Sequence, residues 1–133
     1  MPLSLAVVTP TQEALATVCD EVVVPGISGE MDFLPGHVAL ISALSPGVMT
    51  TIRDGRRSNF VVSSGFVEVD HDKVTVLCDA CEPVAAIDAD RAKRALDEAV
   101  QKLKDLGPND PGYGEAERRR ARAQARLDGK ARG

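Results

Sequence analysis

Aromatic residues are scarce in this chain of 133 residues, which contains three phenylalanines, one tyrosine and no tryptophan. Modules that read single-stranded RNA or DNA stack the bases on aromatic side chains. The scarcity therefore argues against a sequence-reading nucleic-acid module. The formal net charge of −4 argues in the same direction, because nucleic-acid backbones are themselves negative.

Cysteine and long apolar runs are also in short supply. The three cysteines, Cys19, Cys78 and Cys81, are too few and odd in number for a disulfide framework, which agrees with a reducing compartment. No segment approaches the roughly 20 apolar residues that cross a bilayer. The N-terminus MPLSLAVVTP lacks the basic start and long apolar stretch of a signal peptide. We therefore expect a location in the cytoplasm.

Charge divides the chain into two parts. Residues 1 to 84 carry 11 acids and 4 bases, whereas residues 85 to 133 carry 9 acids and 12 bases. The spacing of the apolar residues changes from a period of two to a helical period at the same place, near Val84. We predict two domains, residues 1–84 and residues 85–133.

The first part has the pattern of short antiparallel strands. Residues 3–7 alternate, and the runs 48–53 and 59–63 flank Asp54-Gly55, a strong hairpin signal. The runs 66–70 and 74–79 form a second expected hairpin through His71-Asp72-Lys73. Gly65 indicates a bend or a bulge. This spacing of strands and turns predicts a β-sandwich or barrel.

The second part predicts a helical hairpin, so the expected fold class is α+β. Apolar residues recur every three or four positions from Ala92 to Leu106, Asp88 is suited to be the N-cap, and Gly107-Pro108 stops the helix. A second helix is expected from Glu115 to about Asp128, ended by Gly129. Its apolar positions on one face are few: Ala116, Ala123 and Leu127. We therefore expect the hairpin to be weakly attached to itself and to the sheet.

Two short patterns resemble metal or redox motifs. Cys78 and Cys81 have the Cys-x-x-Cys spacing, but zinc needs a second pair and redox chemistry needs a helix N-terminus after the strand. His37 lies near Glu30 and Asp32, but one histidine in a Pro-Gly turn is more typical of an ordinary turn than of a metal centre. We predict no catalytic residue and no metal site.

Four segments occur in order along the chain: PGISGEMDFLPGHVALISALSPGV, SSGFVEV, VTVLCD and IDADRA. Together they resemble the epsilon subunit family of bacterial F-type ATP synthase. The resemblance covers essentially the whole chain, and G-E-x-x-x-L-P-G-H followed by L-x-x-x-L-x-P-G is its most specific part. Asp32 stands where the family usually has glycine, and Ala39 stands where proline commonly follows the histidine.

The resemblance implies a noncatalytic rotor subunit of a proton-translocating synthase that requires no cofactor. Its β-sandwich is expected to bind the gamma subunit and to rest on the ring of c subunits, coupling ring rotation to ATP synthesis. The helices are expected to reach the alpha and beta catalytic subunits and to restrain ATP hydrolysis. The implied location is peripheral, on the cytoplasmic face of the bacterial inner membrane, with membrane contact only through the complex.

The stretch from residue 29 to residue 48 is interpreted as a docking loop. Glu30 and His37 match family positions at the contact with the c-subunit ring. The turn at Pro35-Gly36 is expected to present Glu30, Asp32 and His37 together at one end of the sandwich.

The segment IDADRA resembles the I-D-x-x-R-A motif with which some bacterial members hold regulatory ATP. Ile87, Asp88, Arg91 and Ala92 match it, and Arg119, Arg122 or Arg126 could reach the phosphates. The alternative is that Asp88 is only a helix cap.

The second helix has an excess of positive charge whose main carriers are Arg118, Arg119, Arg120, Arg122 and Arg126. We interpret these arginines as the regulatory part of the hairpin, acting on the catalytic subunits. One alternative is a solvated helix face. Another is a free-standing β-sandwich binding module whose basic hairpin recruits an acidic protein or nucleic acid.

Overall fold

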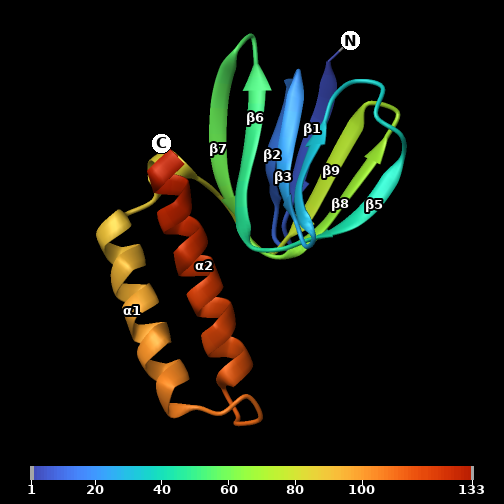
Figure 1. The fold of residues 1–133 in the computed structure, drawn as a ribbon. Helices are drawn as coiled ribbons and strands as arrows, with labels where there is room; N and C mark the ends of the chain where they lie inside the picture. Colours follow the sequence, from blue (N-terminus) through green and yellow to red (C-terminus); the bar gives the residue numbers. More distant parts are fainter. Residues whose placement is uncertain (1, 133) are drawn as a thin grey trace.

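The computed structural model describes residues 2–132, which form a β domain followed by a helical hairpin (Figure 1). The strands are β1 Leu3–Val8, β2 Glu13–Cys19, β3 Glu21–Gly26, β4 Gly29–Phe33, β5 Leu40–Leu44, β6 Gly47–Arg53, β7 Arg56–Val62, β8 Gly65–Asp70, β9 Lys73–Cys78 and β10 Cys81–Pro83. The helices are the 3₁₀ turn η1 Val84–Ala86, α1 Ala89–Asp105 and α2 Tyr113–Arg132. The expected α+β class is confirmed.

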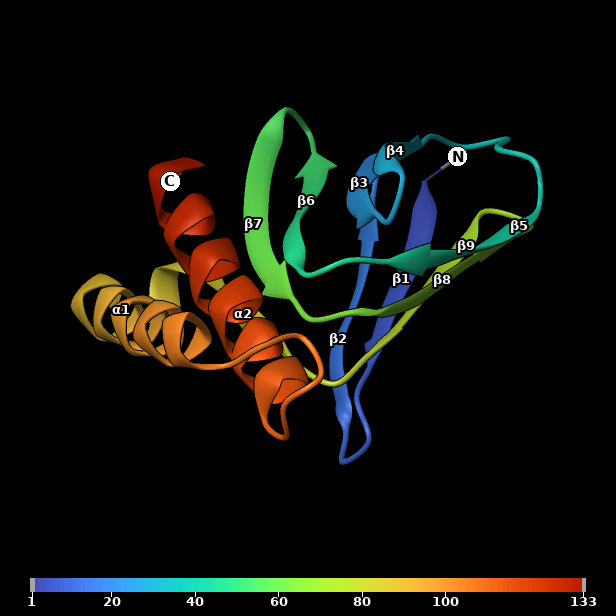
Figure 2. The same cartoon turned by 60° about the horizontal axis from the view of Figure 1, so that its bottom comes forward.

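The strands form one continuous sheet that folds over on itself. Their order is β10-β7-β6-β3-β5-β8-β9-β1-β2, with β4 paired to the free side of β3. A single residue pair, Gly26 with Leu44, joins β3 to β5. The sheet is not wholly antiparallel, since β1 and β9 run parallel. Figure 2 shows the two halves of the sheet facing each other as the layers of a sandwich.

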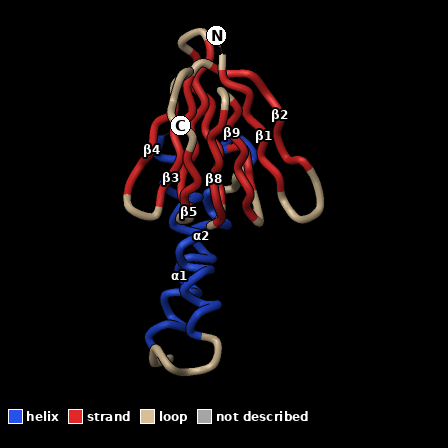
Figure 3. Tube along the Cα trace, turned by 90° about the vertical axis from the view of Figure 1, so that its right-hand side faces the viewer, coloured by secondary structure: helices blue, strands red, loops and turns tan. Residues whose placement is uncertain are grey.

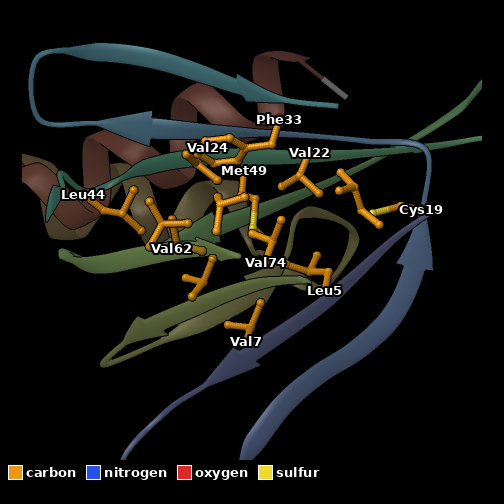
Figure 4. Close-up of a cluster of buried hydrophobic side chains, with 14 of the residues drawn as sticks. Leu5, Val7, Cys19, Val22, Val24, Phe33, Leu44, Met49, Val62 and Val74 are labelled. Carbon is orange, nitrogen blue, oxygen red and sulfur yellow. The ribbon is translucent and has the colours of Figure 1, made fainter. Parts of the chain in front are cut away.

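The core lies between these two layers (Figure 4). Alternate residues of β1, β3, β8 and β9 point inward, as the period-two pattern predicts. Phe33 is the largest of the fully buried side chains, among them Leu3, Leu5, Val22, Met49, Val67 and Val74. All members of this cluster belong to residues 3–78.

Both predicted hairpins are present. Asp54 and Gly55 have φ values of 51° and 77°, and His71 and Asp72 have values of 48° and 60°. Positive φ at both central residues is the type I′ geometry that matches strand twist. The glycine at position 65 allows close strand approach, because a Cβ there would lie 1.9 Å from the carbonyl oxygen of Leu77. Gly65 is therefore a regular strand residue at a point where β8 and β9 approach closely, and not the expected bulge or bend.

The interpretation of residues 29–48 as one docking loop is wrong. The segment contains all of β4 and β5 and the start of β6, so only residues 34–39 and 45–46 of it lie outside strands. Met31 and Phe33 point inward from β4, while Glu30 and Asp32 point outward. The strand β4 pairs with the neighbouring β3, and β5 pairs with β8. Pro46-Gly47 lies at the start of β6, whereas Pro35-Gly36 lies in the loop between β4 and β5.

The helix α1 begins as predicted. Asp88 is the N-cap, and its side chain accepts a hydrogen bond from the backbone N–H of Arg91 at 3.1 Å. The helix ends before Gly107, whose N–H donates to Asp110 in the turn that leads to α2. Neither helix in the described part of the chain is long and apolar enough to span a membrane.

The second helix is longer than predicted. It runs from Tyr113 to Arg132, so Gly129 lies inside it and does not end it. A Cβ at position 129 would lie 2.9 Å from a methyl group of Val61 and 3.0 Å from one of Val84. Gly129 is a glycine because α2 lies against the sandwich at this point, and that contact supports the last helical turn.

The hairpin is attached to the sandwich through α2, which lies between α1 and β7 (Figure 2). Figure 3 shows the hairpin extending from one end of the sandwich. Ala125 joins Val61, Val84 and Ile87 in a second small core. Two of the three predicted apolar positions, Ala116 and Ala123, are buried, and α2 also buries Ala125 and Gly129. Leu127, the third predicted position, is only half-buried.

Candidate interaction sites

One outward face of the sandwich is apolar where a soluble strand face is usually polar. The strand register places Ala43, Phe66, Leu77 and Val8 side by side across β5, β8, β9 and β1. Phe66 is 57% exposed and Leu77 is 48% exposed. Ile41, 72% exposed, extends this row along β5. We call these five residues the outer apolar face.

A depression of about 650 Å³ lies at the end of this face. Phe66, Leu77, Val8 and Ala43 line it together with the neighbouring turn residues Thr9, Pro10, Ser64, Gly65 and Asp79. An exposed apolar surface of this kind is typical of a binding site for another protein. Among the described residues that line it, Asp79 is the one charged side chain, so the lining is mostly uncharged.

Glu30 is the second residue of β4 and lies on the outward side of that edge strand. Its carboxylate accepts a hydrogen bond from Nη1 of Arg132, at 3.3 Å, near the end of α2. Asp32, two residues on, points to the same side and lies beside Glu21 of β3. A hydrogen bond with Asp32 raises the pKa of Glu21 above its ordinary value. The edge of the sheet is therefore acidic.

His37 lies in a separate loop beyond the other end of β4. The backbone N–H of His37 donates to the carbonyl oxygen of Leu34 at 3.1 Å, and Gly36 has a φ of 86°, so Pro35 and Gly36 form the expected tight turn. The ring meets Phe33 edge-on at 5.0 Å, and Nδ1 donates to the carbonyl oxygen of Val38. The N–H of Gly36 donates to Asp72, which fixes the loop to the β8–β9 turn.

The turn therefore presents His37 alone. Glu30 and Asp32 are strand residues, so the expectation that one turn presents all three polar groups is wrong. The physical reason is the inward anchoring of Met31 and Phe33, which draws residues 29–33 into a strand that pairs with β3. Among residues 2–132, no group of three or more His, Cys, Asp or Glu side chains is placed to hold a metal ion.

The four residues of the IDADRA motif lie together at the start of α1. Ile87 is buried in the small core and Ala92 is buried against α2, whereas Asp88 and Arg91 are exposed. A pocket of about 200 Å³ is lined by these four residues with Glu82, Ala86 and Arg126. Of the three arginines considered for this site, the structure brings only Arg126 into the same pocket.

Arg126 already has an anionic partner in this pocket. Both Nε and Nη2 of its guanidinium donate to Glu82, at 2.9 and 2.8 Å. The pair is about one-third exposed and joins β10 to α2. Arg119 and Arg122 line a neighbouring pocket of about 160 Å³ between the two helices, together with Lys102 and Arg126. The two pockets share Arg126, so cationic groups follow one another along the hairpin.

The five arginines predicted to be regulatory differ in their surroundings. Arg119 pairs with Glu115 and Arg120 pairs with Glu117, each one turn away on α2. The pairing lowers the pKa of Glu117 and raises that of Arg120. Arg118 and Arg122 are exposed and make no ion pair within residues 2–132. These two carry the positive charge that is free to meet another molecule.

The Cys-x-x-Cys pair lies at the junction of β9 and β10. Burial, with smaller contributions from Cys78 and Glu82, raises the pKa of Cys81 to about 11. Burial also raises the pKa of Cys78. Both thiols are therefore protonated at neutral pH, which is the opposite of a reactive redox cysteine.

Two residues of these sites, Glu82 and Arg132, were not predicted from the sequence, and Gly129 was predicted only as a helix end. Glu82 and Arg132 form ion pairs with partners 44 and 102 residues away. No local sequence pattern predicts an ion pair between residues so far apart in the chain. The sequence did contain a signal for Gly129. An isolated glycine among strong helix formers is compatible with close packing inside a helix as well as with a helix end.

The fold and these sites correspond to a known two-domain family. Residues 2–84 match the family described as ATP synthase, Delta/Epsilon chain, beta-sandwich domain, and residues 86–128 match its long alpha-helix domain. The chain belongs to the delta/epsilon chain family of ATP synthase. It is a noncatalytic subunit of the central stalk.

Individual relatives agree with this assignment. The chain is 40% identical over 129 residues to the ATP synthase epsilon chain of Myxococcus xanthus, covering 97% of this chain and 94% of that one. It is 40% identical over 130 residues to that of a Synechococcus strain, covering 96% of both, and 38% identical over 125 residues to that of Geobacter metallireducens, covering 94% and 91%. These matches do not support the alternative of a free-standing binding module.

Two solved structures have the same fold at low sequence identity. A chain in the Euglena gracilis mitochondrial ATP synthase structure gives a TM-score of 0.81 at 22% identity and covers 93% of this chain and 78% of that one. A chain in the Tetrahymena thermophila mitochondrial ATP synthase structure gives 0.61 at 11% identity, with 98% and 97% covered. The similarity to both extends over the sandwich and the hairpin.

Proposed function

We propose that this chain couples rotation of the c-subunit ring to ATP synthesis by linking the ring to the gamma subunit. The outer apolar face is the observation that carries this proposal. It supplies an extended apolar surface on a rigid sheet, which suits a permanent contact within a rotor. The sandwich would bind gamma through this face, while its acidic edge and the His37 loop would meet the ring.

Replacement of the apolar side chains tests the gamma contact. Phe66→Asp with Leu77→Asp places two charges on the outer apolar face without changing the core, because both side chains point away from it. We expect gamma to be lost when the subunit is purified from assembled enzyme. Val100→Asp is the matched control, since Val100 is an exposed apolar residue on α1, away from this face. Equal retention of gamma by both variants would reject this contact.

For the ring contact we propose Glu30 and His37 as participants. Both are on the surface, and both lie next to exposed apolar residues, Ile27 in the β3–β4 turn and Val38 in the loop. Cysteine at either position should form a crosslink with the polar loop of a c subunit. A crosslink to a c subunit from position 30 but not from position 37 would restrict the ring contact to the β3–β4 edge. Crosslinks from both positions to gamma alone would mean that this end of the sandwich faces gamma and not the ring.

A location follows from these partners. A subunit bound to both gamma and the ring is held at the membrane surface through the complex, on the cytoplasmic side of a bacterial inner membrane. Fractionation supports this proposal if the chain is found with membranes that retain gamma, and is released when the catalytic part is stripped off. Release of the chain while gamma stays bound to the ring would reject it.

For the hairpin we propose regulation by ATP at the IDADRA motif. Arg91 and Arg126 line one pocket, and two guanidinium groups can bind phosphate oxygens with charge-assisted hydrogen bonds. The pocket of about 200 Å³ is smaller than the roughly 300 Å³ at which ligand sites begin, so phosphates fit there and the nucleoside would lie outside. Phosphate binding to Arg126 would displace Glu82.

Calorimetry with the full chain tests this proposal. Heat of binding with millimolar ATP should be lost in Arg91→Ala, and affinity should increase in Glu82→Gln, which removes the competing carboxylate. Arg94→Ala is the matched control, because Arg94 lies on the same helix and lines none of the pockets around the motif. No heat with the unmodified chain, or equal loss in both arginine variants, would remove nucleotide from the function of this site.

A further inference from the structure

Glu30 has a partner that lies within the hairpin. Arg132, in the last turn of α2, donates from Nη1 to Oε2 of Glu30 at 3.3 Å. The two side chains are 49% and 56% exposed, so the pair lies at the surface, where another molecule can reach it. The contact joins the edge strand of the sandwich to the end of a helix 102 residues later in the sequence.

The sheet beneath α2 explains why Arg132 reaches this strand. The register across β7, β6, β3 and β4 aligns Val61 with Val48, and aligns Pro25 with Glu30 at the edge. A Cβ at Gly47 would lie 2.7 Å from Pro25, so β6 and β3 are also close at this level. The end of α2 therefore lies over a row of apolar residues that finishes at the carboxylate of Glu30.

Gly129 determines how closely α2 approaches this row of apolar residues. Its missing Cβ lets the backbone rest on methyl groups of Val61, Val84 and Val48. Arg132 follows three residues later on the same side of the helix, so its long side chain extends past the apolar row to the edge strand. The position of Arg132 is thus a consequence of the docked helix.

We propose that Glu30 is shared between the docked hairpin and the c-subunit ring. The inference rests on the proposed ring contact and adds its regulation. When α2 is docked, Arg132 holds the carboxylate and the end of the helix lies beside it. When the ring contributes its own hydrogen-bond donors to Glu30, Arg132 loses its partner. Docking of the hairpin and contact with the ring therefore oppose each other at this residue.

Linkage makes the opposition reciprocal. If the ring weakens docking of α2 by some factor, docking of α2 weakens the ring contact by the same factor. An exposed ion pair contributes little, so the expected effect is up to about fivefold in either equilibrium. An effect of this size biases a mobile hairpin without preventing assembly.

The first arm of the test uses the full chain without the ring. Amide hydrogen exchange in residues 125–132 reports opening of the docked end of α2. Arg132→Gln and Glu30→Gln should each accelerate this exchange by up to about fivefold, and the double variant should add nothing further. Lys130→Gln removes a charge from the same last turn and should leave exchange unchanged, because Lys130 makes no ion pair within residues 2–132.

The second arm uses the assembled complex that contains the ring. A cysteine at Ser28, in the β3–β4 turn beside Glu30, reports ring contact through its crosslink to a c subunit. Arg132→Gln should raise the crosslinking yield by up to about fivefold, and Lys130→Gln should not. In this complex Arg132→Gln should accelerate exchange in α2 less than it does without the ring, because the ring holds Glu30 in part of the population.

The outcomes separate the inference from the proposed function. A crosslink that forms but is equal in Arg132→Gln and Lys130→Gln would overturn the sharing of Glu30 and leave the ring contact intact. Exchange that accelerates equally with and without the ring would overturn it as well. The absence of any ring crosslink from positions 28, 30 and 37 would instead reject the ring contact itself.

Discussion

Individual residues of α2 show how a helix with few large apolar side chains is attached to a sheet. Ala125 and Gly129 are buried against Val61 and Val84, where larger side chains would not fit. Close packing of small residues gains dispersion contacts along the backbone itself. The cost is that a single methyl group at such a position has to displace its neighbours.

Gly129→Ala tests this close approach at the residue scale. Alanine favours an isolated helix by up to about 1 kcal/mol over glycine, but its Cβ would meet two valine methyl groups at 2.9 and 3.0 Å. Overpacking of this kind costs about 1–3 kcal/mol. We expect urea unfolding and hydrogen exchange of residues 125–132 to report a less stable docked hairpin.

Gly114→Ala is the matched control, because a Cβ there meets only the flexible side chain of Arg118, at 3.4 Å. It should be stabilising or neutral. Equal stabilisation by the two alanines would mean that α2 moves away from the sheet at little cost, and would contradict the role given to Gly129.

The thiol of Cys81 predicts a pH dependence. Its pKa is raised from 9.0 to about 11, mainly by burial, so the folded chain keeps this proton when the unfolded chain has lost it. Stability from this group is therefore complete below pH 9 and falls as pH rises toward 11, by about 2 kcal/mol. Urea unfolding at several pH values should show a shallower fall for Cys81→Ala. Parallel curves for the two proteins would contradict it.

At the scale of elements, the sandwich has its own core and the hairpin adds a second one. The main cluster uses residues 3–78 only, whereas the small cluster combines Val61 of β7 with Val84, Ile87 and Ala125. The two ion pairs, Arg126 with Glu82 and Arg132 with Glu30, lie around the small cluster. Release of the hairpin therefore breaks the small cluster and spares the main one.

Truncation after Val84 tests this division. The product should unfold in a single cooperative transition, because a domain of this size can bury about 60% of its unfolded surface. It should be less stable than the full chain by about 1–3 kcal/mol, since Val61 and Val48 lose the cover of α2. Circular dichroism during urea unfolding measures both. A broad, noncooperative transition would show that the hairpin is part of one core.

At the scale of the whole molecule, the hairpin projects from the sandwich (Figure 1). Arg118, Arg119 and Arg122 are exposed along α2. Only the end of α2 is held by the sandwich. A hairpin held at one end and charged along its length can exchange between a docked and an extended position. The restraint of ATP hydrolysis that the family resemblance implies would act as a brake and requires such an exchange.

The arginines of α2 predict how this brake responds. Replacement of Arg118, Arg119, Arg120 and Arg122 by alanine keeps helix propensity and removes charge. ATP hydrolysis by the assembled enzyme should rise while assembly is unchanged. Arg118→Ala with Arg122→Ala should give most of the effect, because Arg119 and Arg120 are already paired with Glu115 and Glu117.

High salt should act in the same direction, since exposed charges are screened over about 8 Å at physiological ionic strength and over less when salt is added. Lys93→Ala with Arg94→Ala, on α1, controls for loss of charge as such. Unchanged hydrolysis in the quadruple variant, with the subunit present, would leave the arginines as a solvated face.

The sequence by itself determined the features that depend on near neighbours. Asp54-Gly55 has the chemistry of a type I′ turn, and Asp88 caps α1, whatever the rest of the chain does. The change of apolar period near Val84 separated strands from helices. The G-E-x-x-x-L-P-G-H segment indicated the family, because a specific motif keeps its order along the chain.

The tertiary structure decided which surface of each element meets another. Gly129 could end a helix or lie inside one, and only the position of Val61 and Val84 made the second outcome stable. The strand β4 exists because β3 pairs with it, which moved Glu30 out of the loop that holds His37. Arg132 reached Glu30 from 102 residues away. Burial and ion pairing depend on distances through space, and a local pattern contains no information about those distances.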